Sequence, residues 1–186
     1  MPSLPETIHL IYEPVMLLGS PKDEAYSHYV WDTLPMLWSL DKVRNWCGKI
    51  LLSGSRPDYQ IALLAALGIS PEQIIFRDSE KEIVECPLLV VPGYMSVNNN
   101  VIRREGLSVL QRLARTNDGS PRPPGPRRIF VDRGGDRSAI RRLTNEDQIW
   151  AILSALGFVR VSPGLISLEQ KRDLFGAAEF VVGQYG

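Results

Sequence analysis

The sequence lacks the features that are typical of disulfide-rich, zinc-binding, membrane-spanning and secreted proteins. It contains only two cysteines, Cys47 and Cys86, which are too few for a disulfide framework and lack zinc-site spacing. We expect both to be buried, reduced thiols. No apolar run approaches the ~18 residues that a membrane span requires. The N-terminus has no Lys or Arg and so does not favour a secretory signal. These absences predict a cytoplasmic protein without a transmembrane segment, free or peripheral to the membrane.

The chain also has no excess of charge of either sign, because 21 Lys and Arg balance 21 Asp and Glu. Binding to nucleic acid depends on excess cations that displace counterions, so we expect no nucleic-acid partner. The apolar fraction of 44% and the charged fraction of 23% are typical of soluble domains, which excludes wholesale disorder.

Proline and glycine concentrate in one stretch, residues 116–126, where they make up six of the eleven positions. Such a segment cannot continue a helix or a central strand and forms a semi-rigid linker. We therefore predict an N-terminal domain over residues 1–115, a linker over 116–126 and a second domain over 127–186.

In the first domain, short apolar runs alternate with segments of helical periodicity. We predict a helix over residues 24–43 with a kink near Leu34, because Pro35 has no N–H to donate to the preceding turn. A second helix over 58–67 ends at Gly68, and a third spans 101–115. The predicted strands are 8–12, 15–18, 49–53, 74–76 and 88–91. Strands that alternate with helices predict βαβ units and a largely parallel sheet, an α/β fold.

The second domain has a simpler pattern. Strands over 128–132, 158–161 and 180–183 alternate with helices over 146–156 and 168–178. Asn145 with Gln148, and Ser167 with Gln170, have the spacing of capping boxes. We therefore predict a βαβαβ unit whose last strand, Phe180–Gly183, is an apolar edge.

Arginines gather around the domain junction: residues 112–142 contain nine, against three aspartates and no lysine. Four of them, Arg133, Arg137, Arg141 and Arg142, fall between a strand end and the next helix, the edge at which doubly wound sheets bind ligands. A guanidinium matches phosphate oxygens in pairs, so the pattern indicates an anion site. The same arginines could instead form a solvated loop paired with nearby aspartates.

His28 and Asp32 are four residues apart and share one face of the predicted helix. A histidine held by a carboxylate can act as a general base near neutral pH. The alternative is an ordinary helix in which Asp32 stabilises His28 while Trp31, Leu34 and Leu37 pack in the core. We expect His9, in a strand, to be a packing residue.

We expect no metal and no cofactor. Asp78, Ser79 and Glu80 form an acidic triplet, but Lys81 and Glu82 beside it favour a solvated turn. No other group of histidine, cysteine and acidic residues has metal-site spacing.

Three ordered segments resemble glycosyltransferase family 61. The first is Tyr26-x-His28-x-x-x-Asp32-x-Leu34-Pro35. The second is Ile129-Phe-Val-Asp-Arg133, followed by Arg141-Arg-Leu-Thr-Asn145-Glu146. The third combines Gly157-Phe158, Leu168-Glu-Gln170 and Val181-Val-Gly183-Gln-Tyr-Gly186, in which Tyr185 stands where the family usually has histidine. Together the segments span residues 26–186.

The resemblance implies a GT-B fold of two Rossmann-like domains and inverting sugar transfer from a nucleotide sugar to a saccharide or other hydroxyl acceptor, usually without an essential metal. It implies that His28 and Asp32 serve the acceptor side and that one of them is the base. On the donor side, Arg133 and Arg141 would bind the diphosphate, with Arg137 as a helper. Asn145 and Glu146 would order the loop or contact the nucleotide, and the last motif adds Gly183 and Gly186.

Family members normally continue past the glycine that corresponds to Gly186, so we expect the second domain here to be incomplete. The alternative function is therefore a non-catalytic, truncated or degenerate paralogue that binds a nucleotide, a glycan or a partner protein. The sugar, the acceptor and the oligomeric state stay open.

Overall fold

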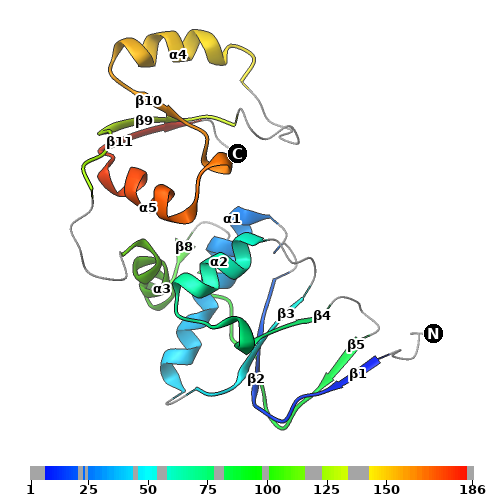
Figure 1. Cartoon of the computed structure of the whole chain (residues 1–186). Coiled ribbons are helices and arrows are strands. Elements are labelled where there is room, and N and C mark those ends of the chain that lie inside the picture. Colours follow the sequence, from blue (N-terminus) through cyan, green and yellow to red (C-terminus); the bar gives the residue numbers. More distant parts are fainter. Residues whose placement is uncertain are drawn as a thin grey trace. The chain divides into compact units, whose positions relative to one another are not determined.

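A computed structural model gives the fold of the chain (Figure 1). It describes residues 7–20, 23, 25–43, 46–53, 58–77, 82–97, 101–115, 123–133 and 143–183. The chain divides into two compact units, Met1–Leu113 and Ala114–Gly186, and each is described by itself. The first part of the predicted linker, residues 116–122, lies outside the described residues, and residues 123–126 contain neither helix nor strand. None of the helices in the described part is long and apolar enough to cross a membrane.

The first unit is built on a four-stranded parallel sheet in the order β4-β3-β2-β6. Its strands are β2 (Val15–Leu18), β3 (Lys49–Ser53), β4 (Ile74–Arg77) and β6 (Leu89–Val90). The central strands are almost completely buried, with Val15, Met16 and Ile50 at 0% exposure. Helix α2 (Asp58–Ala66) joins β3 to β4, followed by the short 3-10 helix η3 (Pro71–Gln73). The predicted α/β organisation with parallel strands is confirmed.

The helical connection from β2 to β3 changes type twice. It begins as α1 (Tyr26–His28), continues as the π-helix η1 (Tyr29–Thr33) and ends as the 3-10 helix η2 (Leu34–Lys42). The predicted kink near Leu34 therefore takes the form of a change of helix type next to Pro35, which cannot donate a backbone hydrogen bond. Leu34 and Leu37 are buried as expected, whereas Trp31 is 38% exposed and is not a core residue.

Some short strands of the first unit were not predicted, and two expectations about residues of this unit are wrong. Strand β1 (Thr7–Leu10), predicted over residues 8–12, lies outside the main sheet and pairs in parallel with β5 (Glu82–Glu85), which was not predicted. Both faces of this ribbon are partly solvated, so His9 is an exposed residue 3.8 Å from Glu82 and not a packing residue. The cysteines are free, as expected, but Cys47 is exposed and Cys86 partly exposed, so neither is buried.

The last helix of the first unit begins later than predicted. Residues Val101–Ile102 form strand β8, which pairs antiparallel with β7 (Ser96–Val97), and helix α3 spans Arg104–Ala114. Gly106 lies where a Cβ atom would meet Met95 and Pro35 at 2.8 and 2.9 Å, so α3 packs closely against the helix that follows β2.

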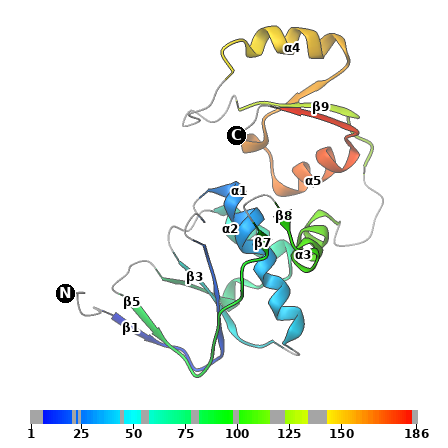
Figure 2. The ribbon, with the colours of Figure 1, turned by 180° about the vertical axis from the view of Figure 1, so that it is seen from behind.

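The second unit has the predicted βαβαβ order. Strand β9 (Arg128–Val131) lies between β10 (Val159–Val161) and β11 (Phe180–Gly183), and all three are parallel. Helices α4 (Glu146–Ala155) and α5 (Leu168–Ala177) cover opposite faces of this sheet, as both views show (Figures 1 and 2), and the 3-10 helix η4 (Pro163–Leu165) precedes α5. Strand β11 pairs only with β9 among the described strands, and its four residues are exposed, which confirms the predicted apolar edge.

The two predicted capping boxes have different outcomes. At α5 the box is formed: the Ser167 N–H donates to the Gln170 side chain at 2.8 Å, and the Gln170 N–H donates to Ser167 Oγ at 3.1 Å. At α4 the prediction is wrong, because the Asn145 side chain makes no cap hydrogen bond. Instead the Asn145 main-chain carbonyl accepts from the Gln148 N–H at 3.1 Å.

This difference predicts unequal effects of two alanine substitutions. Ser167→Ala removes a formed cap and should lower the free energy of unfolding by about 1 kcal/mol. Asn145→Ala removes no cap bond and should change it by less than about 0.5 kcal/mol. Urea denaturation of the two variants beside the wild-type protein measures both values, and equal losses would contradict the assigned caps.

Candidate functional site

In each unit, one place on the sheet is suited to bind a ligand. In the first unit, β3 lies on one side of β2 and the later strand β6 lies on its other side. In the second unit, β10 and β11 lie on the two sides of β9 in the same way. Ligands of such sheets bind outside the carboxyl ends of the strands, where the strand order reverses. Ser20 and Asp23 follow β2, whereas Asp132 and Arg133 follow β9. Among the described residues, Ser20 and Asp23 of the first unit and Asp132 and Arg133 of the second therefore follow the strand at which the order reverses.

The predicted pair of His28 and Asp32 is formed. His28 Nδ1 and Asp32 Oδ2 are 2.8 Å apart, and the side chains are 35% and 13% exposed. A carboxylate oxygen can only accept, so the hydrogen in this contact lies on Nδ1. When the ring is neutral, this contact leaves the lone pair on Nε2, in the tautomer that can take a proton from a substrate.

The second oxygen of Asp32 supports a functional role for this pair. Oδ1 is buried and has no hydrogen-bond partner among the described residues. A buried, unsatisfied carboxylate oxygen is unfavourable and uncommon in folded proteins.

A second carboxylate, Asp23, lies near the start of the same helix and was not predicted. It is 6% exposed and accepts hydrogen bonds from Ser20 and Thr33. Burial, with added repulsion from Asp23 and Tyr59, raises the pKa of Tyr29 well above its usual range. Tyr29 therefore stays neutral and is unsuited to act as the base at this edge. The position of Asp23, just after a buried strand and Gly19-Ser20, is the signal that could have identified it.

In the second unit, a charged network occupies the carboxyl end of β9. Asp132 is buried and accepts hydrogen bonds from Arg160 of β10 and from the Ser162 hydroxyl. Arg160 also donates to Glu146 at the start of α4 and lies over the Trp150 ring at 5.9 Å from its centre. Hydrogen bonding to Asp132 raises the pKa of the Arg160 guanidinium, which stays charged.

Sequence patterns did not predict Arg160, Ser162 or the role of Asp132 in this network. Glu146, which was predicted to order the loop or contact the nucleotide, is an ion-pair partner of Arg160. Arg160 is an isolated arginine in a strand, 28 residues from Asp132, so only the parallel pairing of β9 with β10 brings the two together. The one available signal was that Asp132 directly follows a buried strand.

The other predicted donor-side residues fall into two groups. Arg133 is the second residue after β9 and is partly exposed, Asn145 precedes α4, and Gly183 ends β11. A Cβ atom on Gly183 would meet the Val131 side chain at 3.2 Å and the Val131 carbonyl at 3.3 Å, so the close approach of β11 to β9 favours glycine there. Arg137, Arg141 and Gly186 lie outside the described residues, as does the triplet Asp78 to Glu80.

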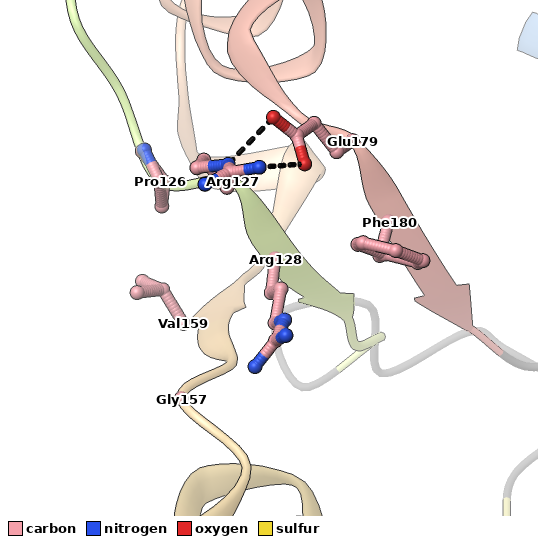
Figure 3. A pocket seen from close by; sticks show the side chains of 7 residues that line it. All are labelled: Pro126, Arg127, Arg128, Gly157, Val159, Glu179 and Phe180. Atoms are coloured by element: carbon pink, nitrogen blue, oxygen red, sulfur yellow. Dashed lines mark hydrogen bonds and ion pairs between the residues drawn. The ribbon is translucent and has the colours of Figure 1, made fainter.

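Other arginines of the cluster are engaged elsewhere. A hollow of about 460 Å³ opens at the amino ends of the three strands of the second unit (Figure 3). There Arg127 forms a two-contact ion pair with Glu179, and Arg128 donates to the Leu156 carbonyl at 2.7 Å and lies over the Phe180 ring. Among the described arginines of the cluster, Arg133 therefore stands alone at the carboxyl edge. Within the same described part of the chain, no three His, Cys, Asp or Glu residues are grouped to hold a metal ion.

Comparison with known protein families identifies a match over most of the chain. The sequence model described as Glycosyltransferase 61 matches residues 26–186, which includes the His28–Asp32 pair and the whole of the second unit's sheet. No curated protein and no solved structure matches the chain.

Proposed function

The chain belongs to glycosyltransferase family 61, and we propose that it moves a sugar from a nucleotide-diphosphate donor to a hydroxyl acceptor with inversion at the anomeric carbon. The observation that carries this proposal is the 2.8 Å contact between His28 Nδ1 and Asp32. Inverting transfer needs one base on the acceptor side and positive charge on the donor side. Each unit supplies one of these at its own switch point.

His28 is the proposed base. Its side chain is the more exposed of the pair, and the contact with Asp32 leaves Nε2 to receive a proton. The acceptor O–H gives its proton to Nε2 as the acceptor oxygen attacks the anomeric carbon. The bond from that carbon to the diphosphate oxygen breaks, and the electron pair leaves with the diphosphate. Asp32 fixes the ring and stabilises the imidazolium that forms.

In the described part of the second unit, Arg133 is the residue that we propose binds the diphosphate of the sugar donor. It follows β9 at the switch point, and a guanidinium can bind two diphosphate oxygens with a charge that does not titrate. Arg137 and Arg141 are proposed to add to this charge. The N-terminus of α4, with Asn145 and Glu146, and the glycines Gly183 and Gly186 complete the proposed donor side, which uses cationic side chains instead of a metal ion.

The two units are proposed to be the two Rossmann-like domains of a GT-B fold. Each has parallel strands and a switch point next to its candidate residues, which supports this assignment. The first unit would then provide the acceptor side and the second the donor side.

Binding of uridine diphosphate tests the donor side. At a hundredfold excess over Kd, a ligand that binds the folded state alone adds about 2.7 kcal/mol of stability and so raises the melting temperature. Uridine diphosphate should produce such a rise in the wild-type protein, and Arg133→Ala should remove it. Thermal unfolding followed by fluorescence measures both.

Arg127→Ala is the matched control, because it removes an arginine from the same cluster at the opposite edge of the sheet. This variant should keep the ligand-induced rise. An equal rise in Arg133→Ala would refute the donor role of Arg133. If uridine diphosphate binds but no uridine-diphosphate sugar is consumed with any saccharide acceptor, the non-catalytic alternative gains.

A further inference from the structure

Asp23 connects three segments of the first unit. It lies just beyond the carboxyl end of β2, where it is 6% exposed. Its main-chain carbonyl accepts hydrogen bonds from the Tyr59 hydroxyl at 2.9 Å and from Gln60 Nε2 at 3.0 Å, both in the first turn of α2. Asp23 is therefore held in place from one side by α2.

The Asp23 carboxylate faces two further segments. Oδ2 accepts from the Ser20 N–H and Oδ1 from the Ser20 hydroxyl, both at 2.6 Å, and Oδ1 also accepts from the Thr33 hydroxyl. Thr33 is completely buried. A carboxylate in such surroundings is tolerated where hydrogen bonds satisfy its oxygens, as they do here. Outside its own loop, the carboxylate is hydrogen-bonded to helix η1 through Thr33.

The contact with Thr33 bears directly on the candidate base. Thr33 is the neighbour of Asp32 and the last residue of the π-helix η1, in which the Leu34 N–H donates to the Tyr29 carbonyl. Single π turns inside helices occur frequently at functional sites. Because Thr33 is anchored to Asp23, the helix cannot rotate about its axis without breaking a buried hydrogen bond. That rotation sets the direction in which Asp32, and with it His28, projects.

We propose that Asp23 is a positioning residue: through the Thr33 hydroxyl it fixes the rotation of η1 and so aims the Asp32 carboxylate at His28 Nδ1. This role rests on the proposed function of the His28–Asp32 pair as the acceptor-side base. Asp23 itself contacts neither member of the pair in the described structure and acts through Thr33.

The tautomer of His28 gives a direct readout that does not depend on turnover. The chain has two histidines, so His9→Gln leaves His28 as the single ring to be observed. In that background and at alkaline pH, where imidazole is neutral, nitrogen NMR of the ring distinguishes the Nδ1–H from the Nε2–H form. The parent should show Nδ1–H, as the contact with Asp32 requires.

Thr33→Val removes the hydroxyl and keeps the shape, and Thr33→Ser keeps the hydroxyl. Thr33→Val should shift His28 toward the Nε2–H form, whereas Thr33→Ser should retain Nδ1–H. Ser20→Ala removes a different hydrogen bond to Asp23 and should also retain Nδ1–H. Unchanged tautomers in Thr33→Val, or equal changes in Ser20→Ala, would overturn the proposal.

In an assay of sugar transfer, the same variants should change kcat much more than the KM for the donor. Small misplacement of a catalytic group lowers turnover by up to about 10²-fold. Thr33→Val should therefore lower kcat by tenfold or more with little change in the donor KM, and Thr33→Ser should restore it. If the parent shows Nδ1–H but transfers no sugar, the proposed function fails while the positioning role is still decided by the tautomers.

Discussion

Replacing His28 with glutamine is expected to lower kcat for sugar transfer by about 10²- to 10⁴-fold, the usual contribution of a general base. Glutamine has similar size and polarity but cannot take the acceptor proton. The His28 side chain lies partly exposed beside Asp32, so the substitution creates no large cavity. Folding should be retained and turnover lost.

Release of uridine diphosphate from uridine-diphosphate xylose or uridine-diphosphate N-acetylglucosamine, with saccharide acceptors, measures this effect. His9→Gln is the matched control, since His9 lies in the small ribbon of β1 and β5 beside Glu82. It should keep its activity. Asp32→Asn should also lower kcat strongly, because an amide that donates a hydrogen bond to Nδ1 favours the wrong tautomer. If the His28→Gln variant keeps full activity, His28 is not the base.

Phe130→Ala is expected to destabilise the protein by about 3 to 5 kcal/mol, the range for removing a buried aromatic side chain. Phe130 is 1% exposed in the central strand β9 and stacks on Trp150 with ring centres 6.1 Å apart. Among the described residues of the second unit, the buried apolar side chains are just Ile129, Phe130 and Val161. The remaining buried side chains are too few to compensate for this loss of folding free energy, so the second unit should unfold locally.

Amide hydrogen exchange, followed segment by segment, measures this loss directly. In Phe130→Ala, β9 and β10 should lose protection while β2 and β3 of the first unit keep theirs. Phe180→Ala is the control, because Phe180 is 54% exposed on the edge strand. A surface change of this kind should alter stability by less than about 0.5 kcal/mol. Equal losses in the two variants would contradict the assigned core of the second unit.

The elements that sequence patterns predicted well are those with short-range causes. Alternating apolar runs identified the strands of both main sheets, and the four-residue spacing of His28 and Asp32 predicted a contact that is formed at 2.8 Å. Gly68 and Gly157 end helices in left-handed conformation, with φ of 86° and 78°. Each of these depends on residues within a turn of one another, which a sequence displays directly.

The features that escaped prediction have long-range causes. Arg160 finds Asp132 through the pairing of β10 with β9, and Tyr59 and Gln60 reach Asp23 through the packing of α2. His9 was expected to pack because its neighbours are apolar, but Glu13 and Pro14 separate its strand from the main sheet. Asn145 has the right spacing for a capping box, yet its backbone, at φ −116° and ψ 30°, differs from the extended form that such caps use.

The contact of Arg160 with both Asp132 and Glu146 has a thermodynamic consequence for the segment between them. Bringing the two ends of a loop together lowers the conformational entropy of the chain. This unfavourable free energy must be offset before the loop can hold a ligand. Here one side chain joins the two ends of the segment that carries Arg133, Arg137 and Arg141. Folding therefore offsets this entropy loss in advance, so the diphosphate that these arginines are proposed to bind would not have to bring the ends of the segment together.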